Sequence, residues 1–368
     1  MFPKKGGNNI TNSEKICSIL CENKFLPEFV FNDLNFEINK SQKELADLAI
    51  EINNVLLIIQ VKERNKILSK EEERKWLKGT VFNTAIKQVK DSFKLQADSK
   101  GIFFKNISGL SSDLSGHKII PIVVFFNKNI NSYSRHYYSE KTNIRINVFD
   151  EDDFRLMITS LLIPIDIINY LEYRTYIVPE SHIPTIDNLM DVMITNSETN
   201  TCIISNKSEE GLINSFYAIN RIDNRADENI LKYRHFLDIF TARQLDDTDP
   251  RILLSKLLLL ERDIISKFIE RYYSTIELSK NRTINFYRLV LTSGIGFLFV
   301  SLNQKNIDIM NHFAYLFKYK NKLNTAIVIW INYEKDIDID YSIIESDWTY
   351  DEVEEKHLID TGEIVDYL

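Results

Sequence analysis

Hydrophobic and polar positions alternate most clearly near the N-terminal end of the chain. Leu48, Ile50 and Ile52 recur at every second position within residues 43–52, and residues 55–61 are apolar at every position but one. The intervening pair, Asn53-Asn54, is of a type that favours the tight turn of a hairpin. We therefore predict a β-hairpin over residues 43–62 with Asn53 and Asn54 as its loop.

Helical and strand periods also succeed one another through the rest of residues 1–175. An opening helix is predicted over about residues 13–22, capped by Ser13, and a long helix over 71–98, broken if anywhere near Gly79. Strands are predicted at 101–104, 118–126 and 143–149, and helices at 151–161 and 164–174. This order predicts an α/β domain with a mixed sheet flanked by helices.

Weak periodicity and two prolines, Pro179 and Pro184, mark residues 175–215 as a boundary region. We therefore expect one domain over 1–175 and another over 176–368. The second is predicted as α/β or α+β, with helices near 226–241, 249–279 and up to about 320, and strands at 284–292, 296–302 and 325–331. Asp336, Asp338 and Asp340 alternate with isoleucines, which indicates a solvated edge strand rather than a calcium loop.

Composition is that of a folded globular protein, with 44% hydrophobic residues and 10 glycines in 368 residues. Cys17, Cys21 and Cys202 are too few and too irregularly spaced for a disulfide framework or a zinc site. Cys17 and Cys21 stand one helical turn apart, which favours a buried helix face. No signal peptide opens the chain and no apolar run is long enough to cross a bilayer, so we expect a cytoplasmic protein without membrane contact.

Net charge is −8, but its distribution is uneven. Residues 1–174 hold 25 Lys and Arg against 22 Asp and Glu, whereas residues 175–368 hold 20 against 31. The basic excess lies in the half that contains the hairpin, which gives mild support to a nucleic-acid partner. A solvated helix face would account for most of those lysines as well.

Three polar side chains are expected to meet on one face at the open end of the hairpin. The predicted loop places Asp47 opposite Gln60, and Lys62 lies two residues further along the same face. Spacing alone favours an ordinary cross-strand ion pair between Asp47 and Lys62. The apolar strands, the basic surroundings and the helix that follows favour a chemical site instead.

The succession of Asp47, the hairpin and Gln60-Val61-Lys62 resembles the PD-(D/E)xK nuclease superfamily, and within it the Mrr-like branch, in which Gln replaces the acid of the last motif. The segment Lys43-Glu44-Leu45-Ala46-Asp47 is similar to the Lys-Glu-x-x-Asp stretch of a group of bacterial nuclease-like proteins. The resemblance covers about residues 10–175 and implies a restriction-endonuclease-like fold. Two positions depart from it: Ala46 stands where Pro is expected, and Ser92 stands where a Tyr often follows the helical Gln.

This resemblance implies a nuclease that hydrolyses DNA with Mg²⁺, or with Mn²⁺ in its place. Asp47 would be the first metal ligand, Gln60 would offer its amide oxygen, and Val61 its backbone carbonyl. Lys62 would orient the attacking water or hold the scissile phosphate.

Because Gln60 carries no charge, a second carboxylate is expected beside the metal, with Glu44 preferred over Glu14. The helix after the hairpin supplies the candidate nucleic-acid contacts Gln88, Lys78 and Lys87. Gln88 is equally consistent with a packing or capping role, and Trp76 is expected in the core.

These features favour a DNA endonuclease joined to an acidic C-terminal domain that senses, regulates, or binds a protein partner or ligand. The resemblance also implies a role in bacterial restriction or antiphage defence and pairing into a homodimer. Gln60 keeps open a second class, a catalytically inactive nuclease-fold protein that binds nucleic acid or a protein. A third class, a protein-interaction module without affinity for nucleic acid, would also fit.

Overall fold

The protein is described from a computed structural model, which divides the chain into two compact units, Met1–Arg225 and Ala226–Leu368. The structure describes residues 11–38, 41–66, 69–98, 103–105, 111–113, 116–130, 133–139, 144–175, 194–196, 201–203, 208–220, 228–242, 251–283, 285–302, 306–349, 351 and 356. The division falls later than the boundary expected after residue 175. No described helix is both long enough and apolar enough to pass through a bilayer.

The predicted hairpin is confirmed. β2 (Ser41–Ile52) and β3 (Val55–Glu63) are antiparallel, and Ile52 pairs with Val55. Asn53 has a φ of 55°, a left-handed conformation that Asn adopts more readily than most residues. The two-residue loop therefore sets the register on which the site prediction depends.

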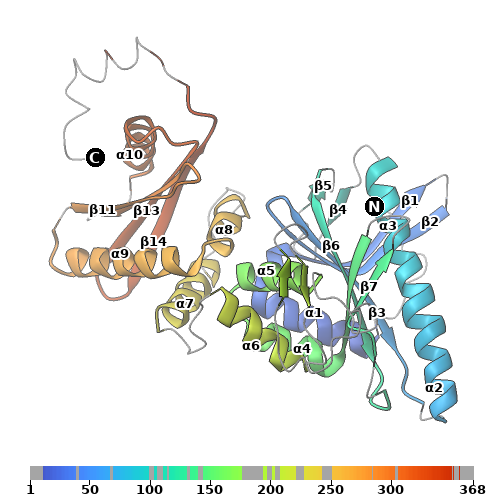
Figure 1. The fold of residues 1–368 in the computed structure, drawn as a ribbon. Coiled ribbons are helices and arrows are strands. Elements are labelled where there is room, and N and C mark those ends of the chain that lie inside the picture. Colours follow the sequence, from blue (N-terminus) through green and yellow to red (C-terminus); the bar gives the residue numbers. More distant parts are fainter. Residues whose placement is uncertain are drawn as a thin grey trace. The chain divides into compact units, whose positions relative to one another are not determined.

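Unit 1 is built on a mixed six-stranded sheet in the order β1-β2-β3-β6-β8-β7 (Figure 1). Its other strands are β1 (Val30–Ile38), β6 (Lys118–Phe126), β7 (His136–Ser139) and β8 (Ile144–Asp150). β3, β6 and β8 run parallel, and the remaining neighbours pair antiparallel. Two short pairs stand outside this sheet, β4 (Phe103–Lys105) with β5 (Ser111–Asp113), and β9 (Ile194–Asn196) with β10 (Thr201–Ile203).

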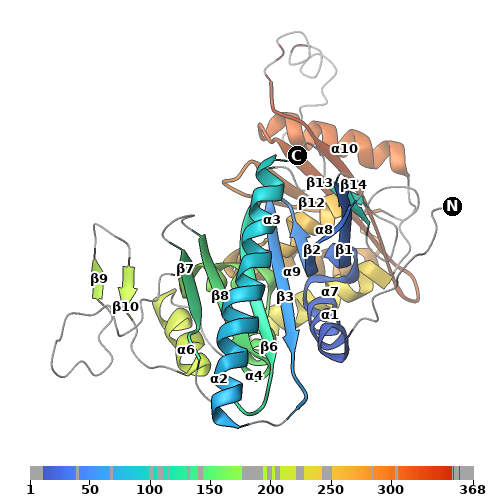
Figure 2. The ribbon, with the colours of Figure 1, turned by 90° about the vertical axis from the view of Figure 1, so that its right-hand side faces the viewer.

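Helices cover both faces of this sheet (Figures 1 and 2). One face carries α1 (Asn12–Phe25), α4 (Glu151–Ser160), α5 (Pro164–Thr175) and α6 (Glu209–Ile219), and the short turn η1 (Pro27–Phe29) joins α1 to β1. The other face carries one continuous rod made of α2 (Lys70–Trp76), η2 (Leu77–Ala85) and α3 (Ile86–Asp98). This is the long helix predicted over 71–98, and at Gly79 it widens into π-helical turns instead of breaking.

The rod packs on the sheet through an apolar cluster. Val81, Ala85 and Val89 from the rod meet Val123 and Phe125 from β6, and all five are fully buried. Because Gln60 pairs with Val123 and Lys62 with Phe125, these two polar side chains share the sheet face that the rod covers.

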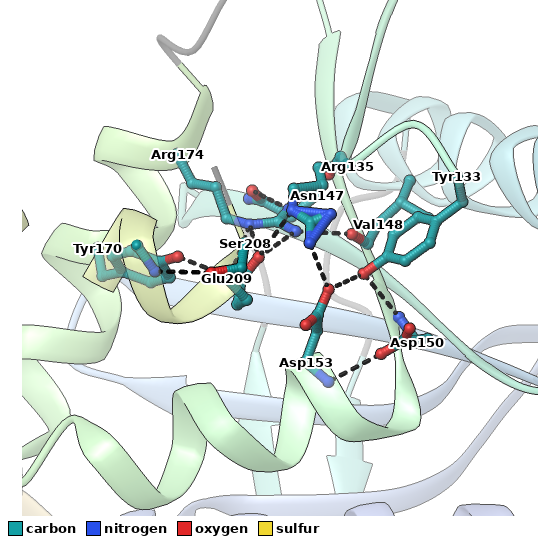
Figure 3. A network of polar contacts seen from close by, with 11 residues as sticks. Tyr133, Arg135, Asn147, Val148, Asp150, Asp153, Tyr170, Arg174, Ser208 and Glu209 are labelled. Atoms are coloured by element: carbon teal, nitrogen blue, oxygen red, sulfur yellow. Dashed lines mark hydrogen bonds and ion pairs between the residues drawn. The ribbon is translucent and has the colours of Figure 1, made fainter. Parts of the chain in front are cut away.

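A buried ion pair fastens α6 to unit 1 and explains why the boundary lies beyond residue 175 (Figure 3). Arg174, near the end of α5, donates from Nε and Nη2 to the two carboxylate oxygens of Glu209 at 3.0 Å each, and both side chains are fully buried. Tyr170 donates its hydroxyl to the same carboxylate at 2.6 Å. Arg174 also donates to the backbone carbonyl of Val148 at 2.9 Å, which ties α6 to β8.

Unit 2 has a four-stranded sheet in the order β11-β12-β13-β14, in which only the central pair is parallel. Its elements are α7 (Glu228–Ala242), α8 (Arg251–Leu258), α9 (Arg262–Lys280), β11 (Asn285–Val290), β12 (Ile295–Ser301), α10 (Ile307–Lys320), β13 (Thr325–Tyr333) and β14 (Ile337–Glu345). Phe268 of α9 packs against Phe297 and Phe299 on one face, while α10 covers the other through Phe317.

Two predictions for unit 2 have different outcomes. β14 is an edge strand that contains Asp338, which is exposed, and Asp340, which is half-buried, so the edge-strand interpretation is confirmed for these two residues, whereas Asp336 lies in the bend before the strand. The single helix expected over 249–279 is wrong, because the chain turns at the buried Leu260 and restarts at Glu261 in an extended conformation. Neither Gly nor Pro marks that turn, so the helical pattern runs through it unbroken.

Candidate functional site

Asp47, Gln60 and Lys62 meet at the open end of the hairpin, where the sequence predicts them. The Asp47 carboxylate accepts a hydrogen bond from the Val61 N–H at 2.6 Å through Oδ2. Lys62 Nζ lies 3.5 Å from the same oxygen and donates to Gln60 Oε1 at 3.4 Å. The three side chains therefore form one cluster, which we call the hairpin cluster.

The hairpin cluster is largely withdrawn from water. Gln60 is fully buried, and the side chains of Asp47 and Lys62 are 6% and 16% exposed. A tight charge-assisted hydrogen bond spans about 2.7–2.9 Å, so the 3.5 Å between ammonium and carboxylate makes a loose ion pair. Among the described residues, the Asp47 carboxylate makes no contact besides those to Val61 and Lys62. The described residues thus place no hydrogen-bond donor on its Oδ1 atom.

Backbone register explains why these side chains gather here. The paired positions of β2 and β3 end at Leu48 and Ile59, one residue before Asp47 and Gln60. The Asp47 side chain then takes the Val61 N–H. Lys62 stands at the C-terminal ends of the parallel strands β3, β6 and β8, which is the edge where ligands bind in open α/β sheets.

The two candidates for a second carboxylate are placed differently. Glu44 lies on β2 with Asn35 as its backbone partner, and its side chain is outside the described residues. The register shifts between Leu34 and Asn35, so strict strand alternation does not hold between Glu44 and Asp47. Glu14 sits in the first turn of α1, where its carboxylate accepts from the Thr11 N–H at 2.7 Å in a capping box.

The oxygen donors of the hairpin cluster suit a hard cation. Within the described residues, no three His, Cys, Asp or Glu side chains are grouped to hold a metal ion. Asp47 and Gln60 nevertheless offer a carboxylate and an amide oxygen, and Mg²⁺ takes one or two carboxylates while keeping several waters. The donor set therefore fits Mg²⁺ held by few protein ligands.

The predicted contacts lie on the rod, which covers the sheet face of Gln60 and Lys62. Lys78 on η2 and Lys87 on α3 are exposed. The side-chain oxygen of Gln88 is buried and has no hydrogen-bond partner among the described residues, while Ser92 Oγ donates to the Gln88 carbonyl at 2.9 Å. Within the described residues, none of these side chains bonds to Asp47, Gln60 or Lys62. Trp76 packs against the core beneath the rod, as expected.

Cys17 and Cys21 are fully buried on α1, which confirms the helix-face interpretation. Burial raises the pKa of both thiols well above its ordinary value, and the carboxylates of Glu151, Asp47 and Glu14 raise that of Cys17 further. Thiols held protonated are poor nucleophiles and poor ligands.

Sequence reasoning missed a contact between α1 and the end of β3. Ser13 was expected to cap α1, but Thr11 is the cap, and Ser13 Oγ donates to Glu63 Oε2 at 2.7 Å instead. Asn65 donates to the other oxygen at 2.6 Å. The hydrogen bond from Ser13, with that from Asn65, lowers the pKa of Glu63. Glu63 is 50 residues from Ser13 in the sequence, so no local pattern pointed to this contact.

A second polar group continues along the same sheet edge at the end of β8 (Figure 3). The Tyr133 hydroxyl donates to Asp153 and accepts from the Asp150 N–H at 3.1 Å, while Arg135 lies 3.1 Å from Asp153. Arg135 also lies 3.5 Å from Glu209, which joins this group to the ion pair of α5 and α6. Tyr133 and Asp153 are 20 residues apart in the sequence, too far for a local spacing pattern to predict their contact.

The hairpin cluster combines one carboxylate, one amide oxygen and one ammonium group at the ligand-binding edge of an α/β sheet. Such a set can hold a hard cation and neutralise a phosphate oxygen. No protein-family model, no curated protein and no solved structure matches this chain.

Proposed function

We propose that unit 1 is a divalent-metal-dependent nuclease that hydrolyses phosphodiester bonds of DNA. The observation that carries this proposal is the convergence of Asp47, Gln60 and Lys62 at the C-terminal edge of the parallel strands. Burying an amide and two charged groups is unfavourable unless they are well paired, and this ion pair is loose. A ligand that completes the site would offset that cost.

Mg²⁺ would be held by Asp47 and Gln60, with the Val61 carbonyl as the further ligand that the family resemblance implies. The bound ion supplies an activated water and polarises the phosphate. The Val61 N–H fixes the Asp47 carboxylate through Oδ2 and leaves Oδ1 for the ion. Lys62 would neutralise charge on a bound phosphate.

The same proposal includes the restriction-endonuclease-like fold and membership of the Mrr-like branch of the PD-(D/E)xK superfamily. Gln88, Lys78 and Lys87 would contact nucleic acid, and Glu44 would supply the second carboxylate. Pairing into a homodimer, a cytoplasmic location, a role in restriction or antiphage defence, and a sensing or partner-binding role for unit 2 follow from the resemblance and the layout.

The test is cleavage of supercoiled plasmid by the pure full-length protein with Mg²⁺ or Mn²⁺, and with EDTA as the metal-free control. Asp47→Asn and Lys62→Met should each lower the cleavage rate by at least about 100-fold. Asp336→Asn, at an exposed aspartate of unit 2, should cut like the wild type. Cleavage that persists in EDTA or in Asp47→Asn would refute the proposal.

A second candidate is a nuclease-fold protein that binds nucleic acid or a protein without cutting. The neutral Gln60 at the centre of the cluster favours it, because replacing an acid by an amide weakens Mg²⁺ binding. Intact plasmid with reduced gel mobility would support this candidate. Plasmid neither cut nor shifted would favour a protein-interaction module.

A further inference from the structure

The outer edge of the six-stranded sheet carries tyrosines paired with basic side chains. β7 is the edge strand, and its Tyr137 and Tyr138 point to opposite faces. Lys90 Nζ of α3 lies 4.8 Å from the Tyr137 ring centre and donates to its hydroxyl at 3.3 Å. The Arg145 guanidinium of β8 lies 5.2 Å from the Tyr138 ring centre.

The two tyrosines are used differently. Tyr137 packs against the apolar cluster beneath the rod, so its ring serves to hold the Lys90 ammonium at the edge. Tyr138 is 44% exposed, a large value for an aromatic residue, and it offers ring surface to solvent beside a guanidinium. Arg145 is fixed in turn by donating to the Thr175 carbonyl at 2.6 Å.

Charge around this edge is positive. Lys87 and Lys94 are exposed on α3, in the turns before and after Lys90, and Asp91 is the acidic residue between them. Its contact with Lys94 is a loose 3.8 Å between two exposed side chains. Lys90 makes no ion pair with a described carboxylate. Basic side chains flanking an exposed aromatic ring are what a single-stranded nucleic acid requires, because phosphates seek the cations and a base stacks on the ring.

Register connects this edge to the hairpin cluster. Ile59, Ile122, Asn147 and His136 lie in one row across β3, β6, β8 and β7. Three strand spacings separate β3 from β7, and Tyr138 and Lys62 lie on opposite sides of that row, so they are roughly 20 Å apart. Lys90 and Tyr137 are on the sheet face of Lys62, and Tyr138 follows around the edge.

We infer that the β7 edge is a binding surface for single-stranded nucleic acid, with Tyr138 stacking on a base and Lys90 and Arg145 contacting flanking phosphates. This inference rests on the proposed function in one respect: the strand it holds is the continuation of the DNA whose phosphate lies at Lys62. The competing explanation is that these side chains guard an edge strand against association with other chains.

The test measures affinity of the full-length protein for a short fluorescein-labelled single-stranded DNA by fluorescence anisotropy. EDTA is present, so cleavage plays no part. Tyr138→Ala should weaken binding about 5- to 150-fold, the loss of one stacked base, whereas Tyr138→Phe should stay close to the wild type. Tyr315→Ala, at an exposed tyrosine on α10 of unit 2, is the matched control and should change nothing.

Salt dependence tests the phosphate contacts. Lys90→Gln should reduce the slope of log affinity against log salt concentration by about 0.7, the value for one single-strand phosphate contact. Lys75→Gln, at an exposed lysine paired with Glu71, should leave the slope unchanged. The same variants with a single-stranded RNA probe tell which sugar the surface prefers.

The outcomes separate this inference from the nuclease proposal. If Tyr138→Ala binds the single-stranded probe with the affinity of the wild type, the inference is overturned. It is also overturned if Tyr138→Phe loses as much affinity as Tyr138→Ala, or if the wild-type protein binds only duplex DNA. Cleavage by such a protein would leave the nuclease proposal standing. Binding that depends on Tyr138, with no metal-dependent cleavage, would support the single-strand binding surface and refute the nuclease proposal. Aggregation of Tyr138→Ala with unchanged affinity of the remaining monomer supports edge guarding.

Discussion

The two units use the same succession of elements and differ in what they bury. In unit 1, strand β3 ends a hairpin, and the chain then passes through α2, η2 and α3 before it forms β6, which lies parallel to β3. In unit 2, the chain passes in the same way from β12 through α10 to the parallel strand β13. Among the described residues of unit 2, the buried polar side chains are hydroxyls, with Lys318 as the exception. Unit 1 buries amides and ionisable groups, namely Gln60, Glu73, Asn127, Asn147, Asp166, Arg174 and Glu209.

Among its described residues, unit 2 thus builds a hairpin with a helical crossover around a single buried charged side chain, Lys318. Burying the polar and charged side chains of unit 1 costs desolvation free energy. Natural proteins place such groups in an otherwise apolar core mainly at functional or strained sites. The ion pair of α5 and α6 is fully hydrogen-bonded and holds elements together. The ion pair of Lys62 and Asp47 is looser, with 3.5 Å between the ammonium and the carboxylate.

The largest effect should come from breaking the tight ion pair. Arg174→Met leaves Glu209 buried without its main partner and should lower the free energy of unfolding of unit 1 by about 3–5 kcal/mol. Urea unfolding of the full-length protein measures it, and Arg174→Met with Glu209→Gln should recover part of the loss. Arg155→Met, which removes an exposed pair with Glu151, should stay within about 0.5 kcal/mol of the wild type. Equal losses in both variants would contradict a special role for the buried pair.

A second variant asks whether the hairpin cluster supports the fold at all. Lys62→Met alone should lower the free energy of unfolding by about 2 kcal/mol, because the buried Asp47 carboxylate loses its ammonium neighbour. Asp47→Asn with Lys62→Met should be as stable as the wild type, since the amide still accepts from Val61 and no charge is left. If the losses of the two single variants add up in the double variant, the cluster is structural.

The apolar crossover of unit 2 should be destabilised by a steric clash, not by loss of an ion pair. A Cβ at Gly296 would lie 2.4 Å from Leu323 Cδ1 and 2.7 Å from Phe317 Cε1, so Gly296→Ala should cost about 1–2 kcal/mol while leaving plasmid cleavage unchanged. Gly79→Ala is the control in unit 1, because nothing lies within 4 Å of its added Cβ. It should instead stabilise the rod by about 0.5–1 kcal/mol. Thermal unfolding of the two variants distinguishes them.

The smallest effect concerns pH. Hydrogen bonds from Ser13 and Asn65 lower the pKa of Glu63, so their stabilisation is present above the ordinary carboxyl pKa and is lost as pH falls through the lowered value. Ser13→Ala should therefore cost about 1 kcal/mol at neutral pH and progressively less in acid. Ser255→Ala, whose hydroxyl donates to the Ile252 carbonyl, should show a pH-independent difference. Parallel acid-unfolding profiles for both variants would contradict the assignment.

Local sequence patterns predicted most helices and strands and the hairpin cluster of the candidate site. The Asn-Asn loop set the register up to Leu48 and Ile59, and Asp47, Gln60 and Lys62 follow directly beyond that last pair. Most helices and strands followed from hydrophobic periodicity in the same way. These are properties of short segments, in which the physical cause lies within a few residues of its effect.

What escaped prediction depends on partners far apart in the chain. β1 and β7 were missed, and β7 is only four residues long. The expected boundary after residue 175 falls before the division after Arg225, because Arg174 finds its partner at Glu209, across a stretch with weak periodicity. The turn at Leu260 is set by burial of that side chain, which sequence spacing does not reveal.

The buried ion pair between Arg174 on α5 and Glu209 on α6 also decides how the N-terminal half can be produced by itself. A fragment ending at residue 175 would retain Arg174 but lose Glu209, leaving a guanidinium enclosed among Phe149, Val148 and Tyr170 with no counter-charge on α6. A fragment that extends to residue 225 keeps both members of the ion pair. Workers who seek crystals or an isolated N-terminal fragment should therefore end it after α6.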